Sequence, residues 1–261
     1  MNPPEWERAL VTGASSGIGE AFARALAAAG TDLVLVARRR DRLEELAGDL
    51  RDSYGRDVEV LAADLTDEAG LADVERRLGD TDHAIDLLVN NAGFATSGHF
   101  AELPVAEEEE QIRLNVLAPV RLTRAALPGM LDRRRGGIVH VSSIAALQPL
   151  PHWATYAATK AYLTSFSEAL HEEVRGRGVV VLALMPGFTH TEFHDRSGMP
   201  GVMIPASLWM RPEQVVASAL KALARGRASH VPGFMNRAVA TLSRLTPRFA
   251  SRRVVGRAGR S

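Results

Sequence analysis

The chain has 261 residues, 46% of them hydrophobic, and Lys plus Arg equal Asp plus Glu at 31 each. This length and composition fit one large α/β domain with a sizeable core. The balanced charge argues neither for nor against a polyanionic partner, and no nucleic-acid partner is predicted. Cysteine is absent, which excludes disulfide bonds and thiol chemistry.

The sequence carries no sign of export or of a membrane span. Its first residues, M-N-P-P-E-W-E-R, do not follow the basic-then-apolar pattern of a signal peptide. The longest apolar run, at residues 179–185, is far too short to cross a bilayer. We therefore expect a soluble, cytoplasmic protein.

Short apolar segments alternate with helical patterns along the chain. Strands are expected at residues 8–12, 31–37, 58–62, 85–90, 137–141, 179–184 and 228–231. Helices are expected at 17–29, 41–52, 67–78, 104–131 with an interruption at Pro119, 152–175 and 212–225. Each strand is apolar throughout rather than alternating, which predicts a parallel sheet covered by helices on both faces. No linker appears, so residues 1–261 are expected to form one domain with a basic extension at about 232–261.

A glycine-rich turn, T-G-A-S-S-G-I-G at residues 12–19, lies between the first strand and the first helix. Its glycines at 13, 17 and 19 would allow a sharp turn, a close approach to a pyrophosphate and tight packing of the helix on the sheet. The helix N-terminus would present free N–H groups to the phosphates. The spacing is G-x-x-x-G-x-G rather than G-x-G-x-x-G, and its position between strand and helix predicts a dinucleotide site.

The end of the second strand indicates which dinucleotide is bound. An acidic residue there would bind a ribose 2′-hydroxyl, whereas an Arg would pair with a 2′-phosphate. This chain has Arg38, Arg39 and Arg40, and its first acid, Asp41, is already at the helix start. We favour NADP(H), with Arg38 first and Arg39 second, and keep NAD(H) as an alternative. The other interpretation is a solvated Arg run at a helix entry.

Two further segments are expected at the ligand edge of the sheet. Asp64 follows the third strand, where a carboxylate could accept a hydrogen bond from the adenine amino group. N-N-A-G at residues 90–93 ends the fourth strand at the same carboxyl edge.

The segment from Ser143 to Lys160 combines a hydroxyl, a phenol and an ammonium group. Tyr156 and Lys160 are four residues apart and share one helix face. An adjacent cation would lower the pKa of the phenol and make Tyr156 an acid/base group at neutral pH. Ser143 would hydrogen-bond the same substrate oxygen. The alternative is a half-buried Tyr beside a Lys that extends to solvent.

Together with P-G-F-T-H-T at residues 186–191, these motifs in this order resemble the short-chain dehydrogenase/reductase family over about residues 8–231. The resemblance implies a Rossmann-type fold with seven parallel strands, and a homodimer or homotetramer. It implies a catalytic tetrad of Asn115, Ser143, Tyr156 and Lys160. In that tetrad Tyr156 exchanges the proton, Ser143 polarises the substrate oxygen and Lys160 binds the nicotinamide ribose. Asn115 interrupts the long helix and positions a relay water next to Lys160.

The resemblance also implies the cofactor contacts. The loop after the sixth strand meets the nicotinamide, and Arg38 and Arg39 alone supply positive charge because the turn has no basic residue. The expected cofactor-binding residues are Gly13, Ser15, Ser16, Gly17, Ile18, Gly19, Arg38, Arg39, Asp64, Leu65, Asn91, Ala92, Gly93, Tyr156, Lys160, Pro186, Gly187, Thr189 and Thr191.

The segment between Thr191 and Arg211 is where the family has its substrate lid. Adaptable apolar side chains there suit a movable cover over a hydrophobic substrate. They are Met199, Met203, Ile204, Leu208, Trp209 and Met210. The expected substrate residues are Phe94, Ser143, Leu147, Trp153 and Phe188. This predicts a small lipophilic ketone or aldehyde, unless the apolar residues pack on the body or on a subunit.

Two features remain. His190 and His194, with Glu192 and Asp195 nearby, imitate a metal site but lack a third well-spaced ligand, so no metal is predicted. Residues 234–245 form an amphipathic pattern within an acid-free, Arg-rich C-terminal segment. This pattern could contact an anionic membrane, or the helix could pack on its own domain while its arginines stay solvated.

The sequence therefore predicts an NADP(H)-dependent oxidoreductase that moves hydride between the cofactor and a lipophilic carbonyl or alcohol. A reductase of carrier-bound 3-oxoacyl groups is one alternative. A non-catalytic NADP-sensing regulator is another, although a sensor does not need a Tyr–Lys acid/base pair.

Overall fold

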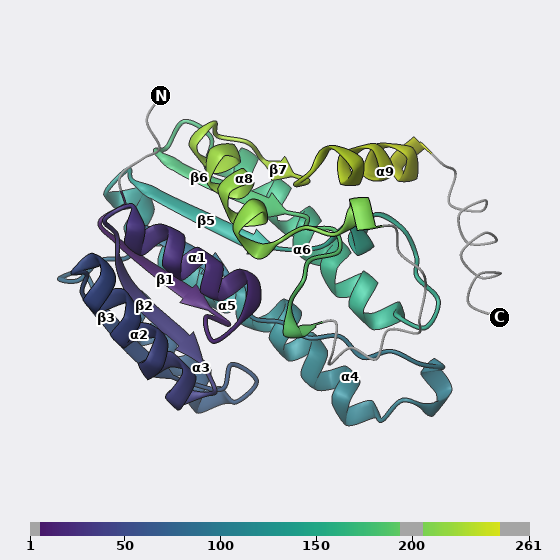
Figure 1. The fold of residues 1–261 in the computed structure, drawn as a ribbon, viewed down its shortest axis with the longest axis horizontal. Helices are drawn as coiled ribbons and strands as arrows, with labels where there is room; N and C mark the ends of the chain where they lie inside the picture. The colour runs from purple at the N-terminus through teal and green to yellow at the C-terminus, as the bar shows by residue number, and fades with distance from the viewer. Residues whose placement is uncertain (1–5, 194–205, 246–261) are drawn as a thin grey trace.

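The structure, a computed structural model, describes residues 6–193 and 206–245. Within these residues seven parallel strands form one sheet in the order β3-β2-β1-β4-β5-β6-β7 (Figure 1). The strands are β1 (Arg8–Thr12), β2 (Asp32–Ala37), β3 (Val58–Ala62), β4 (Leu87–Asn90), β5 (Gly136–Val141), β6 (Val179–Leu184) and β7 (Ser229–His230).

Helices connect the strands. They are α1 (Gly17–Ala28), α2 (Arg40–Tyr54), α3 (Glu68–Leu78), α4 (Val105–Ile112), α5 (Ala118–Asp132), α6 (Ala154–Glu173), α8 (Pro212–Ala224) and α9 (Phe234–Leu245). Short 3-10 turns lie at Phe100–Glu102, Ile144–Leu147 and Ala206–Leu208. The expected Rossmann-type α/β fold is confirmed.

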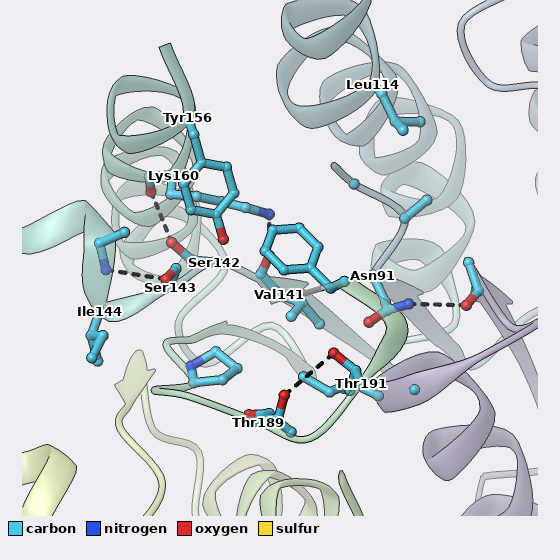
Figure 2. A pocket seen from close by; sticks show the side chains of 18 of the residues that line it. Asn91, Leu114, Val141, Ser142, Ser143, Ile144, Tyr156, Lys160, Thr189 and Thr191 are labelled. Carbon is cyan, nitrogen blue, oxygen red and sulfur yellow. Dashed lines mark hydrogen bonds between the residues drawn. The ribbon is translucent and has the colours of Figure 1, made fainter. Parts of the chain in front are cut away.

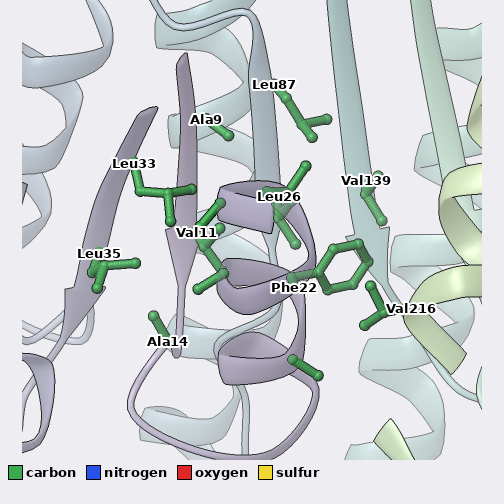
Figure 3. Close-up of a cluster of buried hydrophobic side chains, with 14 of the residues drawn as sticks. Ala9, Val11, Ala14, Phe22, Leu26, Leu33, Leu35, Leu87, Val139 and Val216 are labelled. Atoms are coloured by element: carbon green, nitrogen blue, oxygen red, sulfur yellow. The ribbon is translucent and has the colours of Figure 1, made fainter. Parts of the chain in front are cut away.

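The strands are apolar throughout because both faces of the sheet are covered. On β1, Ala9 and Val11 join a cluster with Phe22 and Leu26 of α1 and with residues of α2 and α8 (Figure 3). Leu10 points the other way, into a cluster with residues of α3, α5 and α6. Successive strand residues therefore enter two separate cores, as period-two alternation requires in a sheet that is buried on both sides.

The long helix expected at 104–131 is interrupted at Asn115, as the family resemblance implied, and not at Pro119. A π-helical turn, Arg113–Leu117, separates α4 from α5, and the N–H of Ala118 donates to the carbonyl of Arg113, five residues back. Pro119 lies in the first turn of α5 instead of breaking the helix. Because Pro119 has no N–H, it is tolerated at a helix start, and the wider turn before it brings Asn115 into the interior with an exposed fraction of 0%.

The C-terminal helix α9 follows β7 and lies at the periphery of the molecule (Figure 1). Asn236 and Ala240 of α9 are buried, and Ala240 packs with Met185 and Val231. Inward packing, the alternative to membrane contact, therefore holds for this face of α9. Among the helices of residues 6–193 and 206–245, none has the length and hydropathy needed to cross a membrane.

Candidate active site

A cavity of about 1280 Å³ lies along the carboxyl edge of the sheet. Its wall is built from the segments that follow β1, β2, β3, β4, β5 and β6, together with residues of α6 and α9. The strand order places the segments after β2 and β3 on one side and those after β6 and β7 on the other. The cavity therefore spans most of the sheet width, at the position where open α/β sheets bind ligands.

The glycine turn after β1 packs too closely to admit side chains. Gly13 and Gly17 have left-handed φ values of 64° and 60°. A Cβ on Gly19 would lie 2.2 Å from the carbonyl oxygen of Gly13, and one on Gly17 would lie 2.9 Å from Cγ2 of Thr191. The start of α1 thus lies directly against the turn, and Gly17 and Ile18 of its first turn line the cavity, where a helix N-terminus can bind an anion.

The turn is tied to β4 by side-chain hydrogen bonds. The Thr12 hydroxyl accepts from the N–H groups of Asn91 and Ala92, at 2.9 Å and 3.0 Å. The Asn91 amide donates to the carbonyl of Thr12 at 2.9 Å. Asn91 therefore holds two segments of the cavity wall together, in addition to lining the cavity as expected.

Two guanidinium groups lie beside the cavity at the end of β2. Arg39 donates to the Ser15 hydroxyl at 3.1 Å and pairs with Glu192 at 3.1 Å. Arg38 is 62% exposed and lies 3.6 Å from a carboxylate oxygen of Asp64. Although burial acts to raise it, the pKa of Asp64 is lowered by hydrogen bonds from Thr66 and by Arg38. This side of the cavity thus offers positive charge next to the glycine turn, as an anionic group on a nucleotide would need.

The two serines after β5 have different surroundings. The Ser142 hydroxyl donates to the carbonyl of Lys160 at 2.8 Å and hydrogen-bonds Thr164 at 2.7 Å. Ser143 caps the turn Ile144–Leu147 and accepts from the N–H of Ala145 at 3.1 Å. Ser142 is 4% exposed and tied to α6, while Ser143 interacts with the Tyr156 phenol. The structure thus places Ser143, as predicted, beside the phenol.

Tyr156 and Lys160 project from one face of α6 into the cavity (Figure 2). The Lys160 ammonium nitrogen donates to the carbonyl of Val141 at 2.8 Å and lies 5.8 Å from the centre of the Tyr156 ring. The phenol ring also contacts Trp153 edge-on, with ring centres 5.5 Å apart, and Phe193 at 5.6 Å. The pair is therefore held between β5 and an aromatic enclosure.

Burial controls the protonation of this pair. It raises the pKa of Tyr156 to about 12, while the Ser143 hydrogen bond acts in the opposite direction. It also lowers the pKa of Lys160 to about 8. The expected lowering of the phenol pKa by Lys160 is therefore not found in this structure, because loss of solvent disfavours the charged phenolate.

Asn115 braces the segment that follows β4. Its amide donates to the carbonyl of Phe94 at 2.9 Å and to the Thr159 hydroxyl at 3.2 Å, and its side-chain oxygen accepts from the N–H of Phe94 at 3.2 Å. A Cβ on Gly93 would lie 2.9 Å from that oxygen and 3.4 Å from the Lys160 nitrogen. Asn115 thus connects the 93–94 backbone to α6 without lining the cavity itself.

The loop after β6 closes one side of the cavity. Pro186, Gly187, Thr189 and Thr191 all line it, as expected, and a Cβ on Gly187 would lie 2.5 Å from the side-chain oxygen of Asn236. The loop is thus packed between α9 and the glycine turn.

The predicted lid residues that the structure describes do not cover the cavity. Met210 forms a backbone bridge with Thr189, and Trp209 packs on Phe188, with ring centres 5.6 Å apart, and on His190, at 4.7 Å. Leu208, Trp209 and Met210 are absent from the cavity wall, so packing on the body is correct for them. Met199, Met203, Ile204, His194 and Asp195 lie outside the described residues.

The predicted substrate residues are mostly at the cavity. Leu147, Trp153 and Phe188 line it, whereas Phe94 does not, because its segment is turned toward Asn115. The predicted cofactor residues also line it, except Gly19, which packs on Gly13.

Several residues of the cavity wall were not predicted from the sequence. They are Val36, Ala37, Ala63, Ser97, Gly98, Leu114, Val141, Ser142, Ile144, Ala145, Gln148, Leu150, Pro151, His152, Phe193, Val239, Ala240 and Ser243. The amphipathic pattern of residues 234–245 showed that α9 had an apolar face but not that this face would meet the cavity.

A parallel sheet with a glycine turn, a basic strand end and a buried Tyr–Lys pair at one edge defines the class of Rossmann-type oxidoreductases. Residues 7–199 match the family model of the short chain dehydrogenases. The chain therefore belongs to the short-chain dehydrogenase/reductase family, whose members are oxidoreductases acting on CH–OH groups.

Individual relatives extend the comparison. A very-long-chain 3-oxoacyl-CoA reductase of Anas platyrhynchos is 35% identical over 188 residues, which are 70% of this chain and 60% of that protein. A short-chain dehydrogenase from Sphingobium yanoikuyae, solved in complex with NADPH, is 39% identical with a TM-score of 0.83, covering 90% of this chain and 91% of that chain. A bulky-bulky ketone specific alcohol dehydrogenase from Comamonas testosteroni is 31% identical with a TM-score of 0.79, covering 94% and 96%.

Proposed function

We propose that this protein is an NADP(H)-dependent oxidoreductase that interconverts a lipophilic ketone or aldehyde and its alcohol. One observation carries the proposal: a single cavity joins the basic side at Arg38 and Arg39 to an apolar side at Leu147, Trp153 and Phe188. The ketone-specific relative and the NADPH complex support the same assignment.

The residues of the basic side fit a dinucleotide. A Cβ at Gly13, Gly17 or Gly19 would collide with neighbouring atoms, so only glycine allows the close packing of turn and helix start that a pyrophosphate site uses. Arg39, positioned by Ser15, and Arg38 would hold a 2′-phosphate. When bound, the reduced cofactor supplies the hydride.

In the reductive direction, Tyr156 would donate its phenolic proton to the substrate oxygen as the carbonyl carbon receives the hydride. The products are then the alcohol, the oxidised cofactor and a phenolate, which regains a proton before the next turnover. A pKa of about 12 keeps the phenol protonated at neutral pH, which is the form that donates. The Ser143 hydroxyl would donate a hydrogen bond to the same oxygen and stabilise its developing negative charge.

Lys160 would stabilise the phenolate that this step forms, and Asn115 would position the backbone beside Lys160. A negative charge on the Tyr156 oxygen would be attracted to the Lys160 ammonium, which the carbonyl of Val141 holds nearby. Asn115 would keep Gly93 beside the Lys160 nitrogen through its two bonds with the Phe94 backbone. We assign Asn115 as a positioning residue because it does not line the cavity.

A second candidate is the reduction of long-chain 3-oxoacyl thioesters. It is favoured by the similarity to the very-long-chain 3-oxoacyl-CoA reductase of Anas platyrhynchos. The helical wall of Val239, Ala240 and Ser243, which adds length to the cavity, also favours it. The third interpretation, a non-catalytic NADP sensor, leaves the buried Tyr156–Lys160 pair without a purpose.

NADPH oxidation with a substrate panel tests the proposal. The panel contains a bulky bicyclic ketone, a long-chain 3-oxoacyl thioester and a polar sugar ketone. We expect kcat/KM for at least one lipophilic substrate to exceed that for the sugar by about tenfold for each 1.4 kcal/mol of extra apolar binding. Faster turnover of the thioester would select the second candidate. Equal or better turnover of the sugar would contradict a lipophilic substrate, and NADPH binding without turnover of any carbonyl would favour the sensor.

A further inference from the structure

Helix α9 has two unlike faces. On its inner face Asn236 and Ala240 are 2% and 4% exposed, and Val239, Ala240 and Ser243 line the cavity. The Gln148 amide donates a hydrogen bond to the carbonyl of Ser243 and so attaches α9 to the turn after β5. The inner face is therefore part of the substrate side of the cavity.

The outer face of α9 is apolar and exposed. Phe234 is 75% exposed, Met235 47% and Leu242 67%, and Ala238 between them is also exposed. We call these four residues the α9 apolar face. Exposed apolar side chains along one face of an amphipathic helix are typical of a surface that lies against lipid or protein.

Arginine side chains lie near the start of this face. From Arg225 to the C-terminus the chain has nine Arg and no acidic residue. Burial and then the charges of Arg227, Arg237 and Arg225 lower the pKa of His230, so these three guanidinium groups act together near the start of α9. Residues 246–261, which follow α9 directly, add five of the nine Arg.

We propose that the α9 apolar face inserts into the interfacial region of an anionic lipid bilayer, with the nearby Arg side chains on the lipid headgroups. An apolar stripe with cations near its start matches both parts of such a surface. A second copy of the chain fits less well, because a two-fold contact through α9 would bring the Arg237 side chains of the two copies together.

This placement has a consequence for substrate entry. Because α9 is about one helix diameter thick, its cavity face and its membrane face are only roughly 10 Å apart. A lipophilic ketone dissolved in the bilayer would then reach the cavity around α9 without crossing bulk water. This consequence rests on the proposed function, whereas the membrane contact itself does not.

Vesicle flotation of the full-length protein tests the membrane contact without any turnover. We expect binding to phosphatidylcholine vesicles that contain about one third phosphatidylserine, and little binding to pure phosphatidylcholine or at high salt. The double substitution Phe234→Gln/Leu242→Gln should weaken binding at least about tenfold, since two buried apolar side chains are lost. Arg237→Gln should weaken it less. The matched control is Phe100→Gln. Phe100 is 66% exposed on another part of the surface, so this variant should bind vesicles as the wild type does.

Three results would overturn the proposal: wild-type protein that does not float, equal binding to neutral and anionic vesicles, or a double variant that binds unchanged. Light scattering on the same samples measures the oligomeric state. If the wild type does not bind vesicles but forms a dimer that the double substitution dissociates, the α9 apolar face binds a second copy of the chain instead. For the entry route, the double variant should lose turnover of a ketone dissolved in vesicles but retain turnover of a water-soluble ketone. If both fall together or neither falls, the route is wrong.

Discussion

Replacing Gly19 with alanine tests the close packing on which the glycine turn depends. Gly19 lies in the first turn of α1, where a Cβ would be 2.2 Å from the carbonyl oxygen of Gly13 and 2.5 Å from the side-chain nitrogen of Asn91. Real Cβ atoms essentially never approach closer than 3.0 Å. The Gly13 atom belongs to the backbone, so the turn or the helix itself must move.

The expected size follows from two opposing terms. Overpacking of this kind costs about 1–3 kcal/mol, while alanine improves helix propensity by up to about 1 kcal/mol. We expect the free energy of unfolding to fall by about 1–2 kcal/mol. NADPH binding should weaken by about tenfold or more, because the displaced turn would carry the phosphate-binding N–H groups.

Gly48→Ala in α2 is the matched control. Gly48 is also helical, but its Cβ would meet nothing within 4 Å, so alanine there should stabilise the protein by about 0.5–1 kcal/mol. Urea unfolding and a fluorescence titration with NADPH measure both quantities. A Gly19→Ala protein as stable as wild type, with the same NADPH affinity, would refute the packing argument.

Three further predictions concern other parts of the molecule. Ser143→Ala should lower kcat about 10²–10³-fold with unchanged stability, whereas Ser142→Ala should keep most activity but lose about 1–3 kcal/mol of stability; the reverse pattern would exchange their roles. Arg39→Ala should weaken NADPH binding about tenfold or more and leave NADH binding almost unchanged, with Arg40→Ala as the control; a parallel loss for both cofactors would contradict a 2′-phosphate contact. Burial lowers the pKa of His140 from 6.5 to about 3. Between these pH values the unfolded chain binds a proton at His140 that the folded chain does not bind. The free energy of unfolding therefore falls as the pH decreases from 6.5 toward 3. His140→Gln should reduce that acid sensitivity by up to about 1.4 kcal/mol per pH unit in urea unfolding, and an unchanged pH dependence would contradict the assignment.

Much of this architecture is readable from local sequence pattern. The strands predicted at 8–12, 58–62 and 179–184 have the observed bounds, because each is a short apolar run between polar or glycine-containing turns. The cavity segments were predictable for a related reason. Parallel strands end at one edge of the sheet, so motifs that follow β1, β4, β5 and β6 must gather there.

Other features depend on contacts between distant segments. Local pattern placed the helix break at Pro119, and only the family resemblance placed it at Asn115, where the π-turn lies and where Asn115 bonds the Phe94 backbone. The pKa of Tyr156 rises because the surrounding chain removes its solvent, and the i, i+4 spacing with Lys160 contains no information about that burial.

The α9 segment shows the same limit. Its apolar periodicity predicted a helix with two faces, and the observed helix has the predicted bounds, Phe234–Leu245. Which face packs inward depends on the positions of Met185 and Val231. Met185 is distant from α9 in the sequence, and Val231 precedes the helix, so neither belongs to its periodic pattern. Periodicity alone could not show that this helix forms a wall of the cavity.

The central claim is that Tyr156 supplies the proton for hydride transfer at the junction of the basic and apolar sides of the cavity. Tyr156→Phe removes one hydroxyl and preserves the ring that contacts Trp153 and Phe193. Steady-state NADPH oxidation with the best lipophilic ketone should fall by about 10²–10⁴-fold, while NADPH binding stays within about twofold of wild type, since the ring and its packing remain. Undiminished turnover in this variant would contradict the account.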